Sequence, residues 1–136
     1  ADDAKAIYAI DIDGDADVDV LSANMNVQGI DGQEIVTWYE NDSSQSFTGR
    51  VILRADASSE IYQAVVVFAI DLDGDGDMDV LATTIGSSSG DWIGGVLWYD
   101  NDGSESFTER TVVQTLNHRI SYSIFAIDMD GDGDVD

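Results

Sequence analysis

Aspartates occupy every second position in three short stretches of the sequence. The clearest is DLDGDGDMD, which covers residues 71–79 and carries five aspartates in nine residues. Like charges this close repel one another unless a cation lies between them. Carboxylate and carbonyl oxygens are the ligands that Ca²⁺ takes, in a flexible cage of about six to eight oxygens. The spacing therefore predicts a tight calcium-binding loop, and glycine at its sixth position permits the sharp turn.

Four other interpretations of the acidic stretches fit less well than a calcium-binding loop: a solvated turn, a magnesium site, an EF-hand and a β-roll. A solvated acidic turn has no reason to keep strict alternation in three copies. Magnesium prefers octahedral geometry and retained waters. An EF-hand requires glutamate at its twelfth position and flanking helices, whereas this position is Ser22 in the first stretch and Ala82 in the second. A nonapeptide β-roll would repeat about every nine residues, and the period here is much longer. Calcium in a loop between strands is the favoured prediction.

The acidic stretches belong to a tandem repeat. IYAIDIDGDADVDVLSA at 7–23 matches VFAIDLDGDGDMDVLAT at 67–83, and IFAIDMDGDGDVD at 124–136 begins the pattern again. Further along each copy, VTWYENDSSQSFTGRVIL at 36–53 matches VLWYDNDGSESFTERTVV at 96–113. The first loop precedes the second by 60 residues, and the second precedes the third by 57. The register therefore holds over most of the unit, and we expect a continuous array without a linker.

Each full repeat is expected to form four short β-strands. In the second copy they should lie near 65–70, 78–84, 94–99 and 107–114, because these segments are rich in β-branched and aromatic residues and are bounded by turn formers. No segment keeps an amphipathic helical period. Four strands in about 60 residues, repeated, are typical of a β-propeller blade, whose faces neighbouring blades cover. We predict an all-β chain of about two four-stranded antiparallel blades and the start of a third. The repeats would cover about 4–63, 64–120 and 121–136.

The segment FAIDLDGDGDMDVL, followed by VLWYDNDGSESF, resembles the VCBS/FG-GAP repeat, the blade of integrin-alpha-type β-propellers. The resemblance covers essentially the whole chain. It implies a propeller of about seven blades, with Ca²⁺ held in the hairpin between the first two strands of a blade. It implies side-chain ligands at positions 1, 3, 5 and 9 of each loop and a backbone carbonyl ligand at position 7. The residues concerned are Asp11, Asp13, Asp15, Asp17 and Asp19 in the first loop, Asp71, Asp73, Asp75, Asp77 and Asp79 in the second, and Asp128, Asp130, Asp132, Asp134 and Asp136 in the third. We expect two to three Ca²⁺ per chain.

Two loops depart from this pattern. The sixth position of the first loop is Ala16, where the others have glycine. If this position needs a left-handed backbone, alanine costs about 1 kcal/mol, and we expect the first site to be weaker or slightly reshaped. The third loop reaches its last predicted ligand at Asp136, with no strand behind it, so its completeness stays open. A closed propeller needs about 4–8 blades, and we favour a segment of a longer array over a self-assembling unit.

Composition narrows the function. The chain has 136 residues, 43% of them hydrophobic, and a formal net charge of −23. This acidity argues against nucleic acids and anionic membranes as partners, because both attract basic surfaces. No apolar run approaches the ~18 residues that membrane insertion would need. Cysteine is absent, and the one histidine, His118, lies in the variable connector. We expect binding and assembly rather than enzymatic catalysis, in a secreted protein that is extracellular or at the cell surface.

Three functions remain open. The first is a structural or adhesive module that binds proteins or extracellular matrix, with neighbouring blades or identical chains as further partners. The second is a lectin-like carbohydrate binder, for which Trp92 in the loop SSSGDWIGG is the candidate contact. The third is a non-catalytic domain of a larger secreted enzyme. Arg50 and Arg110 align between copies, which predicts that each forms a structural ion pair or lies at a strand edge. Aligned aromatic residues should pack between blades. These aromatic residues are Trp38, Tyr39, Trp98 and Tyr99.

Overall fold

The computed structural model describes residues 3–25, 32–44, 46–55, 61–88, 91–104, 106–116 and 123–135. Eight β-strands run through them: β1 (Asp3–Ile10), β2 (Asp19–Met25), β3 (Glu34–Asn41), β4 (Phe47–Arg54), β5 (Ile61–Ile70), β6 (Asp79–Ser88), β7 (Asp91–Asn101) and β8 (Phe107–Leu116). These residues contain no helix long and apolar enough to cross a membrane. The all-β prediction is confirmed, and each strand of the second repeat is longer than expected. For example, β7 begins at Asp91 rather than near residue 94.

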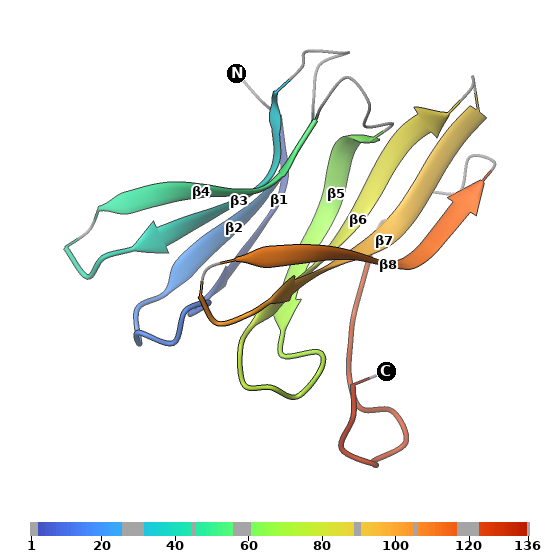
Figure 1. Cartoon of the computed structure of the whole chain (residues 1–136). Helices are drawn as coiled ribbons and strands as arrows, with labels where there is room; N and C mark the ends of the chain where they lie inside the picture. Colours follow the sequence, from blue (N-terminus) through green and yellow to red (C-terminus); the bar gives the residue numbers. More distant parts are fainter. Residues whose placement is uncertain are drawn as a thin grey trace.

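The strands form one curled antiparallel sheet that divides into two meanders (Figure 1). In the first meander, β1 pairs with β2, β2 with β3 and β3 with β4. In the second meander, β5 to β8 pair in the same order. Among the described residues, the strand pairing between the meanders is limited to Met25 on β2 opposite Gln63 on β5. Each meander is therefore a nearly separate four-stranded sheet.

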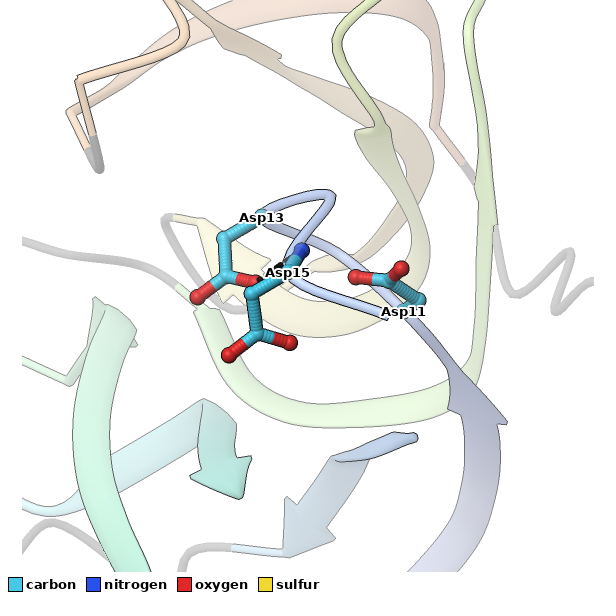
Figure 2. A group of neighbouring side chains, drawn as sticks. All are labelled: Asp11, Asp13 and Asp15. Carbon is cyan, nitrogen blue, oxygen red and sulfur yellow. Dashed lines mark hydrogen bonds between the residues drawn. The ribbon is translucent and has the colours of Figure 1, made fainter. Parts of the chain in front are cut away.

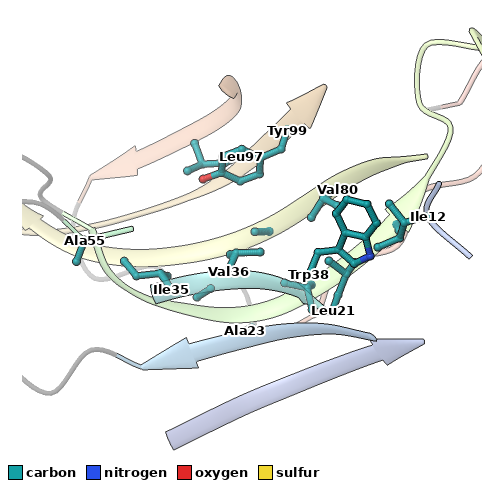
Figure 3. Packing of buried hydrophobic residues seen from close by; sticks show 14 residues of the cluster. Ile12, Leu21, Ala23, Ile35, Val36, Trp38, Ala55, Val80, Leu97 and Tyr99 are labelled. Carbon is teal, nitrogen blue, oxygen red and sulfur yellow. The ribbon is translucent and has the colours of Figure 1, made fainter. Parts of the chain in front are cut away.

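The two meanders share one apolar core (Figure 3). Leu21 and Ala23, two positions apart on β2, lie on one face of the strand because side chains alternate, and both are buried. Trp38 on β3 lies directly opposite Leu21 and is also buried. The second meander adds buried residues of β5, β6 and β7 to the same cluster, namely Ala64, Val67, Ala69, Val80, Ala82, Leu97 and Tyr99. The contact between the meanders is therefore stabilised by burial of apolar side chains rather than by strand pairing. Each large apolar side chain that is buried contributes roughly 1.5–3 kcal/mol.

Aromatic rings connect successive repeats in two places. The ring of Phe107, at the start of β8, meets Trp38 edge-on with centroids 6.3 Å apart. On the first strands, Tyr8 lies 5.1 Å from Phe68, and Phe68 lies 6.0 Å from Phe125. Tyr8, Phe68 and Phe125 each stand three residues before the first aspartate of their loop. The row therefore holds β1, β5 and residues 123–127 side by side, and it brings the three acidic loops to the same end of the molecule (Figure 1).

The aligned arginines form ion pairs, which is one of the two roles predicted for them. Arg50 on β4 donates from Nε to Glu40 on β3 at 2.6 Å, and Arg110 on β8 donates to Asp100 on β7 at 2.7 Å. Each guanidinium also lies over the indole of the tryptophan opposite it, at 5.3 Å in the first meander and 5.1 Å in the second. Exposed ion pairs contribute only about 0–1 kcal/mol each, so their main effect is to cover one face of the indole.

Candidate metal centres

Each of the first two acidic loops closes a β-hairpin. The first lies between β1 and β2, and Ile10 pairs with Asp19 across its base. The second lies between β5 and β6, with Ile70 opposite Asp79. The ninth position of the loop is therefore also the first residue of a strand, which fixes its place in the sheet. In the third loop, residues 128–135 have the same turn without a described strand behind it.

The first aspartate of each loop holds the turn together. The two carboxylate oxygens of Asp71 accept the backbone N–H groups of Gly74 at 2.8 Å and Gly76 at 3.0 Å. Asp11 accepts the equivalent N–H groups in the first loop at 2.8 and 2.9 Å, and Asp128 accepts those in the third at 2.6 and 3.0 Å. A carboxylate has about four lone-pair sites, so each oxygen keeps one that could face a cation.

The third and fifth aspartates are oriented by the loop backbone. In the first loop, Asp13 accepts the N–H of Asp15 at 3.2 Å, and Asp15 accepts that of Asp17 at 2.9 Å. The same bonds measure 3.3 and 2.9 Å in the second loop and 3.2 and 3.0 Å in the third. Such bonds from an aspartate to the N–H two residues on are typical of Asx turns. They fix the directions of the side chains within the loop itself.

The ninth aspartate is buried and joins three segments of a repeat. Asp79 is fully buried and accepts the backbone N–H of Leu72 at 3.0 Å and that of Asn101 at 2.8 Å. Asp19 makes the same bonds in the first repeat, at 3.1 and 2.8 Å. Burial raises the pKa of Asp79 above its usual value, and the negative charge of Asp73 raises it further. A charged carboxylate here is therefore costly unless a positive charge approaches it.

The seventh aspartate is turned toward a different hairpin. The hydroxyl of Ser43, in the turn between β3 and β4, donates to the carboxylate of Asp17. In the second repeat Gly103 stands at the position of Ser43, and a Cβ there would clash with an oxygen of Asp77. Both carboxylates thus lie against the turn between the third and fourth strands of their meander. The assignment of a carbonyl ligand at this position stays a prediction, and the side-chain contacts are consistent with it.

The loops bring three carboxylates together in each repeat. Oxygens of Asp11, Asp13 and Asp15 lie within 4.8 Å of one another (Figure 2). The same holds for Asp71, Asp73 and Asp79 in the second loop and for Asp128, Asp130 and Asp132 in the third. The predicted ligands Asp19 and Asp75 are thus outside the triad of their loop, and Asp136 lies outside the described residues. Desolvation, and then the charges of Asp15, Asp19 and Glu40, raise the pKa of Asp13.

The sixth position of each loop has a left-handed backbone, and this is the conformation in which Ala16 is expected to be costly. Its φ is 76°, and the glycines at this position, Gly76 and Gly133, both have φ of 100°. A Cβ at Gly76 would meet no atom within 4 Å, so the cost of alanine lies in the backbone rather than in a clash. That cost is about 1 kcal/mol, and the prediction of a weaker first site rests on it.

The donor set suits a hard divalent cation. Every residue of the three triads is an aspartate, so the available ligand atoms are oxygens. Oxygen-only sites in flexible loops favour Ca²⁺, whereas sites that contain thiolate or imidazole favour zinc and later transition metals. The triad carboxylates would hold the ion, and the ion would supply the positive charge that the clustered carboxylates lack.

Sequence reasoning missed the residues that connect each loop to the rest of its meander. Asn41 and Asn101, at the ends of β3 and β7, donate their side-chain amides to the carbonyls of Val18 and Met78 at 3.2 and 3.1 Å. Their backbone N–H groups also bind the ninth aspartate. The signal is present in the aligned segments WYEND and WYDND, in which the same asparagine ends the third strand of each repeat. The side chain of Trp92 and all of His118 fall outside the described part of the chain.

Comparison with known proteins agrees with this arrangement. The family model described as the FG-GAP-like repeat matches residues 11–82 and again residues 71–136. Each match begins at the first aspartate of an acidic loop, and the two overlap across the second loop. No curated protein and no solved structure gave a significant match. Since the matched residues cover the chain from its first loop to residue 136, the chain belongs to the FG-GAP-like repeat family.

Proposed function

We propose that this chain is an extracellular calcium-binding propeller module with a structural and adhesive role, and not an enzyme. FG-GAP-like repeats imply propeller blades, so the two meanders are two blades of such an array. The observation that carries the calcium assignment is the recurrence of one hydrogen-bonded loop, in which three carboxylates gather within 4.8 Å in each repeat. Random acidic surface gives no reason for such recurrence.

Calcium would stabilise the fold rather than perform chemistry. A cation at the triad offsets the repulsion among the carboxylates that the loop holds together. Because the ninth aspartate binds both its own loop and the end of the third strand of the meander, a rigid loop also positions that strand. Binding to the folded state alone raises stability by mass action. Extracellular calcium sites can be as weak as about 10⁻⁴–10⁻³ M because the ion is abundant there.

The same features support a binding role. The net charge of −23 favours a salty, calcium-rich setting and disfavours nucleic acid. Propeller arrays present broad surfaces of loops and strand edges, on which recognition of a protein or of matrix carbohydrate can be built. We therefore propose protein or matrix ligands, with carbohydrate as the alternative, and further blades or identical chains as neighbours.

Native mass spectrometry of the full chain, with calcium and after chelation, tests the calcium assignment. We expect two or three bound ions, one for each loop that forms a complete site, and a lower melting temperature after chelation. Asp73→Asn, in the second triad, should remove one ion. Asp77→Asn, whose carboxylate lies against Gly103 instead, is the matched control and should keep every ion. A chain that binds no calcium and melts at the same temperature with chelator would refute the proposal.

A further inference from the structure

The acidic loops contain Asp–Gly pairs, which are the sequences most prone to a spontaneous backbone rearrangement. The second loop has two, Asp73–Gly74 and Asp75–Gly76, and the third has two at the same positions. In this reaction the glycine nitrogen attacks the side-chain Cγ of the aspartate, an N–Cγ bond forms and water leaves, which gives a cyclic succinimide. Glycine permits the attack because it has no Cβ to obstruct it. Water then opens either carbonyl and yields aspartate or isoaspartate, with no oxidant or reductant required.

In this structure the attacking nitrogen and the carboxylate under attack are each hydrogen-bonded to a different group. The nitrogens that would attack are those of Gly74 and Gly76, and both donate to the carboxylate of Asp71, at 2.8 and 3.0 Å. The carboxylate under attack at Asp75 accepts the N–H of Asp77 at 2.9 Å. The third loop repeats the arrangement around Asp128. One aspartate in each loop therefore restrains two potential nucleophiles.

We propose that Asp71 and Asp128 protect their loops against isoaspartate formation, and that opening of a loop exposes its Asp–Gly pairs to this modification. The role of Asp71 and Asp128 follows from their hydrogen bonds alone. The further step, that removal of calcium opens the loops, rests on the proposed function. Isoaspartate inserts an additional carbon into the main chain, so the alternation of carboxylates is lost and the loop cannot re-form. The modification would be a long-lived chemical record of the time that the loop has spent open.

The first loop is a natural internal control. Its fifth and sixth positions are Asp15 and Ala16, so it has only the single pair Asp13–Gly14. The methyl group of Ala16 hinders attack at Asp15 even when the loop is open.

The test is peptide mapping by mass spectrometry of the intact chain, aged at physiological temperature with calcium or with chelator, and scored for isoaspartate in each loop. In chelator, where neither loop holds a cation, Asp71→Asn removes one acceptor oxygen and should raise isoaspartate in the second loop about tenfold over the third loop of the same molecules. That factor corresponds to a loss of roughly 1.4 kcal/mol of protection against opening. Chelation of the unchanged chain should raise isoaspartate in both of these loops, while Asp15 of the first loop, which precedes Ala16, stays unmodified.

Two variants keep the test decisive if Asp71→Asn folds poorly. Gly76→Ala should abolish modification at Asp75 in chelator, and Ala16→Gly should create it at Asp15. Equal isoaspartate in the second and third loops of Asp71→Asn would overturn the protective role. No change at Asp75 in Gly76→Ala and at Asp15 in Ala16→Gly would overturn the claim that an open loop is modified at its Asp–Gly pairs. If calcium binds and Asp71→Asn changes nothing, this inference alone fails. If no calcium binds but Asp71→Asn still raises isoaspartate, the proposed function fails and the protective role stands.

Discussion

The backbone N–H of Asn101 donates to Oδ1 of Asp79 over 2.8 Å, and the equivalent bond joins Asn41 to Asp19 over the same distance. The bond connects the end of β7 to the first residue of β6, 22 residues apart in the sequence. Asp79 also caps its own loop through the N–H of Leu72. A residue that the sequence marks as a metal ligand is therefore also the buried acceptor that fixes two turns of the blade.

Replacement of Asp79 should destabilise the chain even without calcium. Asp79→Ala leaves the part-buried N–H of Leu72 and the buried N–H of Asn101 without an acceptor, at a cost of about 1–3 kcal/mol each. We expect a loss of roughly 2–4 kcal/mol in urea unfolding carried out with chelator. The matched control is Asp77→Ala, which removes a carboxylate of the same loop whose contacts lie near Gly103. Equal stability of the two variants in chelator would show that Asp79 acts only through the metal.

Ala16 offers a direct way to strengthen the first loop. Its φ of 76° is the conformation that Gly76 and Gly133 adopt at the same position. Ala16→Gly should stabilise the loop by up to about 1 kcal/mol, and Gly76→Ala should cost the second loop a similar amount. Calcium titration followed by calorimetry measures the change, with each loop serving as the control for the other. An affinity that falls in Ala16→Gly would contradict the strain argument.

Packing between the blades can be measured with one pair of phenylalanines. Phe107 meets Trp38 across the two meanders, whereas Phe47, at the same position in the first meander, is 52% exposed. Phe107→Ala should cost about 2 kcal/mol in urea unfolding, less than a fully buried phenylalanine because Phe107 is partly buried. Phe47→Ala should change stability by less than about 0.5 kcal/mol. If both variants lost the same amount, the hairpin turn rather than the interface would account for the effect.

The turn after β7 contains a carboxylate whose titration reports on one hydroxyl. The Ser104 hydroxyl, and then its backbone N–H, lower the pKa of Asp102 below its usual value of 3.8. Because the folded state lowers this pKa, the resulting stability is present above pH 3.8 and is lost as the pH falls through the folded value. Ser104→Ala should move the pKa of Asp102 back toward 3.8 in an NMR titration. Asp42, which Ser44 holds in the same way, should not move.

Local patterns in the sequence were sufficient to predict the fold class and the loops in which the candidate sites lie. Alternating aspartates, a period near 60 residues and strands bounded by turn formers depend on neighbours in the chain, and the structure confirms the all-β architecture that they predict. The loop geometry around Asp71 is equally local, because its partners lie three and five residues away.

The members of each triad depend on contacts that are distant in the sequence. Asp79 belongs to the second triad, whereas Asp15 belongs to the first, and the two loops differ by only three residues, at positions 2, 6 and 8. The surroundings differ more: Ser43 donates to Asp17 in the first repeat, and Gly103 stands in its place in the second. Such contacts require the register between β2 and β3 or between β6 and β7, which no local pattern specifies.

In the part of the chain that the structure describes, one strand pairing joins the meanders, Met25 opposite Gln63, and this has a consequence for how such chains change in length. A recombination event that inserts or deletes one whole meander would interrupt almost no backbone ladder. An inserted meander would need only apolar faces that pack against those of its neighbours, and an aromatic ring that continues the row from Tyr8 to Phe68. Genes for this fold can therefore gain or lose the coding sequence of one blade at a time. The number of blades can vary while each blade keeps its architecture.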